Sequence, residues 1–169
     1  MNENQKKIEI MFVDDDPMLL ASTRRQLLKK LPECKLTFFQ RAIEALESIA
    51  IDPPDIVLSD VRMPEMDGAD FLKQVSQSHP STIRLAWTGQ SDGELLDRVF
   101  ETAHLVFGKP CPTETLHEMI STIANFAFQI NAQEPVAPKE LSNKRDALLK
   151  KLLATYNDIF IPNSSLNCK

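Results

Sequence analysis

The sequence lacks several features that would place it in familiar protein classes. No apolar run approaches the roughly 20 residues that a membrane-spanning helix needs. The first residues, MNENQKKIEI, contain no apolar core of the kind found in secretion signals. Only four glycines occur among 169 residues, and neither G-x-G-x-x-G nor a P-loop is present. We therefore expect a cytoplasmic protein with no membrane partner, and a dinucleotide-binding domain is excluded.

Cysteine is also scarce. Cys34, Cys111 and Cys168 show no CxxC spacing, which fits free thiols in a reducing compartment better than disulfides or a zinc site.

Positive charge is deficient overall, because the net charge is −5. After residue 138 there are six Lys or Arg and three Asp or Glu, a balance of +3, so the first 138 residues carry −8. This acidic main part argues against direct binding of nucleic acid.

Apolar segments of two kinds alternate along the chain. Five have strand character: Ile8–Val13, Leu36–Phe39, Ile56–Ser59, Ile83–Trp87 and Leu105–Phe107. Helical spacing follows each of them, and in the first case Leu20, Leu27, Leu28 and Leu31 share one face. Five strand-then-helix units predict an α/β fold, with a five-stranded parallel sheet that is doubly wound, having helices on both faces.

Reactive side chains follow four of the five predicted strands. In order these are Asp14, Asp15 and Asp16, then Asp60, then Thr88, then Lys109. The carboxyl ends of parallel strands meet at one edge of the sheet, so these groups should cluster there. Clustered carboxylates suit Mg²⁺, and a carboxylate can attack phosphorus. Each residue alone fits a structural role, such as a helix cap or turn, but all four strand ends together predict a phosphoryl-transfer site on Asp60.

The stretches VDDDP, LSDVRMPEMDG, WTG and KP resemble, in order and spacing, the receiver domain of two-component response regulators, similar to the chemotaxis regulator. The resemblance covers roughly residues 6 to 131 and implies a flavodoxin-like (βα)5 sandwich. It also implies the following roles: Asp60 as phosphoacceptor, Asp15 and Asp60 as direct Mg²⁺ ligands, Asp14 as a ligand through water, the Arg62 backbone carbonyl as a further ligand, Thr88 as switch hydroxyl, and Lys109 as partner of the phosphoryl group.

The function implied by this resemblance is signalling, with no catalysis beyond self-phosphorylation from small donors and autodephosphorylation. A histidine kinase or phosphotransfer protein would donate the phosphoryl group, and a downstream output protein or domain would read the result. The reading surface would be formed by the helix at Leu95–Val99, the strand Leu105–Phe107 and the helix at Leu116–Ala127. This surface or the C-terminal helix would also serve in a homodimer.

Several finer features accompany the resemblance. A cis peptide is implied between Lys109 and Pro110, and Gly89 is implied to leave room beside the phosphoryl group. The family usually has Tyr or Phe three residues before the lysine, where this chain has Val106. Phe107 should point to the opposite face, because side chains alternate along a strand. The turn after Thr88 and the KPC ending also resemble receivers attached to HD-related output domains.

Two other readings of the site stay open. Haloacid-dehalogenase-type phosphatases also carry a D-x-D pair after their first strand, here Asp14 and Asp16, and would use Asp14 as nucleophile. That reading leaves Asp60 unexplained, and no acidic pair follows Lys109. The second alternative is a receiver used as an unphosphorylated scaffold.

The C-terminal part is expected to be a separate element. We expect a receiver domain over residues 6–131, a linker over 132–138, and an amphipathic helix and tail over 139–169. Pro135 and Pro138 prevent the preceding helix from continuing. Within 139–160 one helical face collects Leu141, Leu148, Leu149, Leu152 and Tyr156. This helix would dock on its own receiver, be the remnant of an output domain, or act as a dimerising or partner-binding arm.

Overall fold

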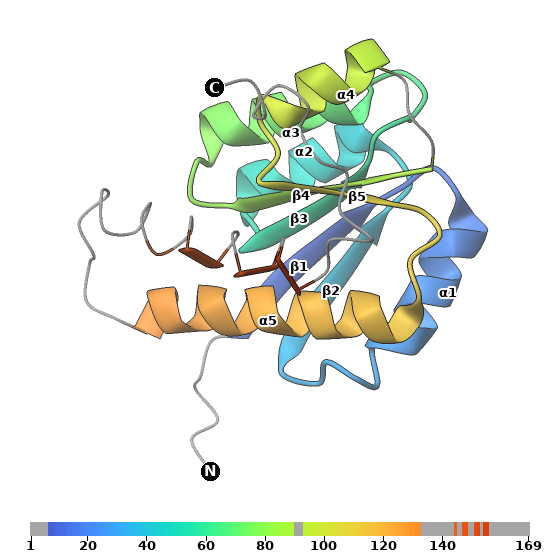
Figure 1. The fold of residues 1–169 in the computed structure, drawn as a ribbon. Helices are drawn as coiled ribbons and strands as arrows, with labels where there is room; N and C mark the ends of the chain where they lie inside the picture. The colour runs from blue at the N-terminus through green and yellow to red at the C-terminus, as the bar shows by residue number, and fades with distance from the viewer. Residues whose placement is uncertain are drawn as a thin grey trace.

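The computed structural model of the protein describes residues 7–89 and 93–132, together with residues 144, 147, 148, 151, 152, 154 and 155. Strands and helices alternate as the sequence predicts (Figure 1). Their bounds are β1 Ile8–Val13, α1 Pro17–Leu27, β2 Cys34–Phe39, α2 Ala42–Ile51, β3 Ile56–Asp60, α3 Gly68–Ser78, β4 Ile83–Thr88, α4 Gly93–Phe100, β5 Leu105–Gly108 and α5 Thr113–Ala132.

The five strands form one parallel sheet in the order β2-β1-β3-β4-β5. The chain moves from β1 outward to β2 and then crosses to the other side of β1 to form β3. The strand order therefore reverses between β1 and β3, which is where a sheet of this type opens a crevice at its carboxyl edge. The predicted α/β class and the flavodoxin-like topology are confirmed.

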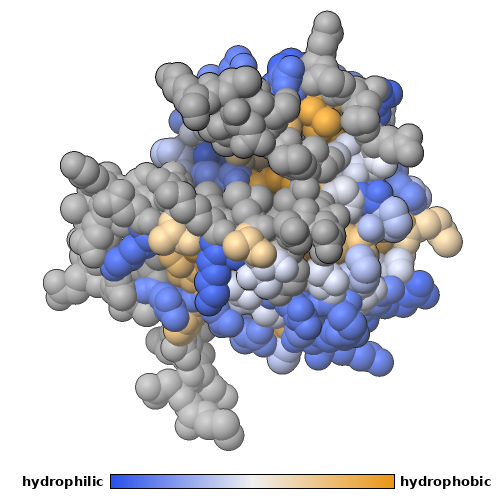
Figure 2. All heavy atoms as spheres, viewed as in Figure 1, coloured by the Kyte–Doolittle hydropathy of each residue, from blue (hydrophilic) through white to orange (hydrophobic). Residues whose placement is uncertain are grey.

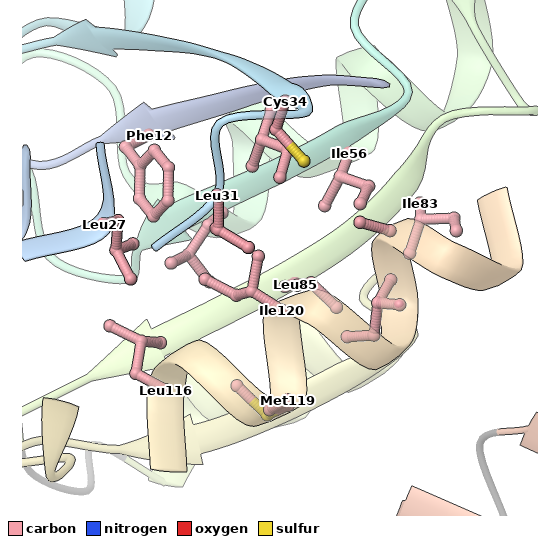
Figure 3. Packing of buried hydrophobic residues seen from close by; sticks show 14 of the residues in the cluster. Phe12, Leu27, Leu31, Cys34, Ile56, Ile83, Leu85, Leu116, Met119 and Ile120 are labelled. Carbon is pink, nitrogen blue, oxygen red and sulfur yellow. The ribbon is translucent and has the colours of Figure 1, made fainter. Parts of the chain in front are cut away.

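Two apolar clusters cover the two faces of the sheet. Helices α1 and α5 pack on one face, and α2, α3 and α4 pack on the other (Figure 1). Figure 3 shows the first cluster, in which Leu116, Met119 and Ile120 of α5 lie across from Phe12, Ile56 and Leu85 of the sheet. We call this set of residues, which includes Trp87 and Phe107, the α5-side cluster. Both faces being covered explains why the central strands are apolar without alternation.

One predicted core residue is exposed. Leu28 is 48% exposed, whereas Leu20, Leu27 and Leu31 are buried. Leu28 keeps helical backbone angles at the C-cap of α1, and it lies about 100° around the helix axis from the buried Leu27, which turns its side chain toward solvent. The chain then turns and brings Leu31 back to the core.

The helices next to the carboxyl edge begin at aspartate caps. The Asp16 carboxylate accepts hydrogen bonds from the backbone N–H groups of Met18 and Leu19, and Pro17 occupies the first helical position of α1. Asp67 caps α3 in the same way through Asp70 N–H. At Gly68, which follows, an added Cβ would lie 2.1 Å from the Asp60 carbonyl oxygen. Only glycine permits this close return of the loop to the end of β3.

The amino edge of the sheet also contains a buried charge. Arg84 in β4 is 7% exposed, and its guanidinium donates to the carbonyl oxygens of Thr102 at 2.8 Å, Thr82 at 2.8 Å and Pro80 at 3.3 Å. The bond to Thr102 joins β4 to the segment that enters β5, and the bonds to Pro80 and Thr82 hold the turn before β4. The guanidinium is thus satisfied largely by backbone acceptors, and the His104 ring lies 3.0 Å from it.

The described residues of the C-terminal tail are helical and lie alongside α5 (Figure 1). Leu152 is 2% exposed and belongs to the α5-side cluster, and Leu148 packs against that cluster. This packing favours a tail docked on its own receiver. The other predicted stripe residues, Leu141, Leu149 and Tyr156, lie outside the described part of the chain. The domain boundaries themselves stay a prediction.

Hydrophilic side chains prevail among the described residues on the face of the molecule shown in Figure 2. Figure 2 shows hydrophilic side chains around α1 and the start of α5, with hydrophobic ones only in small patches. In the part of the chain that the structure describes, no helix combines the length and apolar character needed to cross a bilayer.

Candidate phosphoryl-transfer site

Three carboxylates meet at the carboxyl edge of the sheet, where β1 and β3 lie side by side. Asp14 and Asp15 follow β1, and Asp60 ends β3; one oxygen from each lies within 4.8 Å of the others. Asp14 is 4% exposed and Asp60 is 8% exposed, whereas Asp15 faces solvent. The sequence placed Asp60 just after its strand, but it is the last strand residue and pairs in register with Trp87 of β4. Its carboxylate therefore has a position set by the sheet.

Lys109 joins the two buried carboxylates. Its ammonium donates to Asp60 Oδ1 at 2.8 Å and also to Asp14 Oδ2. The backbone also supports the acids, because Arg62 N–H donates to Asp60 Oδ2 at 3.1 Å and Asp16 N–H donates to Asp14 Oδ1 at 2.9 Å. One ammonium facing two buried carboxylates leaves one negative charge without a partner of opposite sign within this trio.

The pKa of Asp60 reflects this imbalance. Burial raises the pKa of Asp60, and the charge of Asp14 raises it further, against the lowering effect of Lys109 and the backbone. Burial acts the other way on Lys109, but its hydrogen bonds to Asp14 and Asp60 outweigh that effect and raise the pKa of Lys109. The two acids thus stabilise the protonated form of Lys109, while burial and the charge of Asp14 make the ionised form of Asp60 less favourable than in a free aspartate.

The other predicted residues lie at the neighbouring strand ends. Thr88 ends β4, is 3% exposed, and lies in register with Gly108 at the end of β5. A Cβ built on Gly89 has no atom of the described residues within 4 Å, so these residues leave open the space beside it, in keeping with the sequence expectation. The Lys109–Pro110 peptide bond is cis, as the resemblance implies.

The two residues before Gly108 point to opposite faces of the sheet. Val106 is 3% exposed and packs on the α4 side, whereas Phe107 is fully buried in the α5-side cluster. The expectation that Phe107 faces away from the usual aromatic position is thus confirmed. The position that normally holds Tyr or Phe in this family is filled by a valine in a closed core.

An aromatic contact at this site was not predicted. The Lys109 ammonium lies 5.2 Å from the centre of the Trp87 ring, within the range of a cation–π interaction. Trp87 in turn stacks on Phe107, with ring centres 5.9 Å apart. The strand register pairs Trp87 with Asp60, and the sequence gives no sign that the lysine side chain lies over the indole.

Three ion pairs near the site were also missed. Arg41, after β2, donates to Glu65 at 2.6 Å in the loop that follows Asp60, and Glu65 has a φ of 67°. Arg98 of α4 contacts both Asp67 and Asp70 at the start of α3. These partners are far apart in sequence, and no local pattern connects them.

The chemistry of these groups fits Mg²⁺. The acidic trio offers only oxygen atoms, and its negative charge exceeds that of the single ammonium beside it. Hard oxygen ligands with room for water and phosphate are what Mg²⁺ prefers. The Arg62 backbone, already held against Asp60 by its N–H, stands next to the trio.

Comparisons with known proteins agree with the fold and the motifs. The response regulator receiver domain family matches residues 10–121, more than half of the chain. The chain belongs to this family. The phosphoryl-accepting role that the sequence resemblance implied is the standard one of the family. The phosphatase reading, with Asp14 as nucleophile, is therefore set aside.

Among the relatives, the DNA-binding transcriptional regulator NtrC of Escherichia coli K12 is 40% identical over 83 residues, covering 49% of this chain and 17% of that protein. The chain thus corresponds to a small part of that regulator. The signal receiver domain of an HD domain-containing protein from Pseudomonas fluorescens Pf-5 superposes with a TM-score of 0.68 at 25% identity, over 73% of this chain and 99% of that one. A CheY-like receiver from Methanospirillum hungatei JF-1 superposes with a TM-score of 0.67 at 23% identity, over 73% of this chain and 98% of that one.

Proposed function

We propose that this receiver accepts a phosphoryl group on the carboxylate of Asp60 in a Mg²⁺-dependent reaction. The observation that carries the proposal is the position of Asp60: it is buried, fixed at the end of a central strand, and within reach of two further carboxylates and one ammonium. No other carboxylate of the trio combines a strand-fixed position with contacts to both Lys109 and the Arg62 backbone.

In the reaction, an Asp60 oxygen forms a bond to phosphorus of a phosphohistidine on the donor protein. The phosphorus–nitrogen bond breaks, and the donor imidazole nitrogen takes the electron pair. Lys109 is positioned to bind an oxygen of the arriving phosphoryl group, because its ammonium already contacts Asp60 Oδ1. Thr88, at the end of the next strand, is the hydroxyl that would turn toward the modified aspartate.

Asp15, Asp60 and the Arg62 carbonyl would hold Mg²⁺ directly, and Asp14 would hold it through water. The ion supplies positive charge that offsets the charge of the transferring phosphoryl group. The excess of carboxylates over ammonium in the described site, and the raised pKa of Asp60, both support a site completed by a cation.

The proposed partners follow from the family. A histidine kinase or phosphotransfer protein donates the phosphoryl group in the cytoplasm, and an output protein or domain reads the modified form. The likeness to the receiver of an HD domain-containing protein makes an HD-type output one candidate. The chain itself would catalyse no reaction beyond its own phosphorylation from small donors and its own dephosphorylation.

Phosphorylation is tested by intact mass spectrometry after incubation with acetyl phosphate. We expect a mass increase of one phosphoryl group in the presence of Mg²⁺ and none in excess EDTA. Asp60→Asn should abolish the increase, while Asp16→Asn, which changes an exposed helix cap, should retain it. A modified Asp60→Asn protein would refute the assignment, and an unmodified wild type would support the alternative of a receiver used as a scaffold.

A further inference from the structure

Contacts lead from the acidic site into the apolar cluster that also holds part of the C-terminal tail. They begin at Lys109, which contacts Asp60 and Asp14 and also lies over the Trp87 ring. Trp87 stacks on Phe107, and both rings belong to the α5-side cluster. Leu152 of the tail is buried in the same cluster, with Leu148 packed against it.

The corresponding path on the other face of the sheet is weak. There the family's aromatic residue is replaced by Val106, which is 3% exposed among apolar neighbours that include Ala86, Leu96 and Val99. Valine has neither the ring nor the polar end needed to swing between an outward and an inward position. The aromatic side chains that contact Lys109, directly or through stacking, lie on the α5 side.

Trp87 is suited to respond to changes at Lys109. It is 6% exposed, yet its indole N–H has no hydrogen-bond partner among the described residues. The ring is thus held by stacking and by the ammonium, not by a directional bond. If Lys109 turns to a phosphoryl oxygen, the indole loses part of its cation–π attraction. The stacked pair then has a different preferred position.

We propose that phosphorylation of Asp60 is coupled through Lys109, Trp87 and Phe107 to release of the protein's own C-terminal tail. The proposal depends on the phosphorylation described above. Leu152 fills the α5-side cluster in the arrangement where Lys109 lies over Trp87. Because protein cores are close-packed, a shift of the two rings leaves Leu152 less well accommodated. The tail is therefore an intramolecular ligand that binds the unphosphorylated form better.

Coupling of this kind is reciprocal, which gives two independent measurements. The first is the rate of trypsin cleavage after Lys151, whose exposed side chain precedes Leu152. Beryllium fluoride with Mg²⁺ serves as the stable phosphoryl mimic, and its binding is followed by ¹⁹F NMR. We expect the mimic to accelerate cleavage by about fivefold or more, the lower end of typical coupling. The emission of Trp87, the only tryptophan, should change in the same titration.

The second measurement is affinity for the mimic. Leu152→Asn should accelerate cleavage without the mimic and should strengthen beryllium fluoride binding by the same factor of about five or more. Ala154→Asn is the matched control, because Ala154 is exposed on the same segment, and it should change neither quantity beyond about twofold. Retained binding of the mimic shows that each variant is folded.

Substitutions at two neighbouring residues of β5 test the proposed path of coupling. Phe107→Leu should leave mimic binding in place but remove its effect on cleavage, whereas Val106→Ala, on the opposite face, should keep that effect. Unchanged cleavage in wild type with the mimic bound would overturn the coupling while leaving phosphorylation intact. Failure of the mimic to bind would overturn both. Equal loss of the effect in Phe107→Leu and Val106→Ala would overturn the proposed path.

Discussion

The two edges of the sheet each bury a charged group, but they satisfy it in different ways. At the amino edge, the Arg84 guanidinium donates to backbone carbonyls of three residues. At the carboxyl edge, Asp14 and Asp60 share one ammonium, and burial raises the pKa of Asp60. The first edge is complete without a ligand. The second contains unbalanced charge, which costs stability until a cation binds.

This difference teaches which buried charges to treat as functional. A charge surrounded by backbone acceptors holds elements together and needs nothing further. A set of carboxylates with too few cations is a binding site whose ligand must supply positive charge. Variants at the two edges should therefore have opposite effects on stability, as the following predictions state.

The largest effect is expected at the amino edge. Arg84→Met keeps the apolar stem but leaves the carbonyls of Thr82 and Thr102 without their buried donor. The free energy of unfolding should fall by about 2–3 kcal/mol, seen as a Tm about 5–10 °C lower by calorimetry.

The control is Arg98→Met, an exposed arginine that pairs with Asp67 and Asp70. Surface pairs contribute about 0–1 kcal/mol, so this variant should change Tm by only a few degrees. Both variants should still be phosphorylated at Asp60. An equal fall in Tm in the two variants would show that the buried Arg84 contributes no more to stability than an exposed arginine.

A smaller effect is expected from Mg²⁺ at the carboxyl edge. At a free concentration ten times its Kd, the ion should stabilise the wild-type protein by about 1.4 kcal/mol. Its binding should be much weaker in Asp60→Asn, and Arg84→Met should show the same gain as wild type. Calorimetry with and without EDTA measures the stabilisation by Mg²⁺ in wild type and in both variants. A similar gain in Asp60→Asn would place the ion away from the proposed ligands.

The smallest effect is expected from Asp60→Asn without metal. A carboxyl whose pKa is raised by folding adds stability below its usual pKa of 3.8 and loses that contribution as pH rises through the raised value. The substitution should therefore make the protein more stable than wild type at pH 7, by roughly 1 kcal/mol or 2–4 °C in Tm.

The dependence of the stability difference on pH tests whether the substitution stabilises the protein for this reason. The stability advantage of Asp60→Asn should shrink as pH falls toward 4 in EDTA, because the wild-type carboxyl then binds its proton. Asp15→Asn, at an exposed acid of the same trio, is the control and should show a smaller advantage. An Asp60→Asn protein less stable than wild type at neutral pH would contradict the claim that the excess negative charge at this site costs stability.

Much of the fold and of the site was predictable, because both depend on local patterns. Apolar runs bounded by Asp, Pro and Gly identify the strands and turns, and parallel strands must bring their carboxyl ends together. The predicted ends of the strands, which depend on how neighbouring strands pair, were less accurate. Strand β2 begins at Cys34, two residues before the predicted Leu36, because Cys34 pairs with Ile8 of β1.

The contacts that the sequence could not supply depend on side-chain direction and on the tertiary neighbours of single residues. No sequence pattern indicates that Arg84 donates to the carbonyl oxygens of Thr82 and Thr102. Lys109 was expected at the site, but its position over Trp87 follows from the rotamers of both residues. The amphipathic pattern of the tail indicated that Leu152 needs a surface, and only the fold shows that α5 and the sheet provide it.

The central claim is that the unbalanced carboxylate at residue 60 is the phosphoryl acceptor, and chemical mapping tests it most directly. An acyl phosphate is reduced by borohydride to an alcohol, which converts a phosphorylated aspartate to homoserine. After treatment with acetyl phosphate and Mg²⁺, then borohydride, peptide mass spectrometry should find homoserine at position 60 and aspartate at positions 14, 15 and 16. Homoserine at position 14 or 15, with aspartate retained at position 60, would contradict the account.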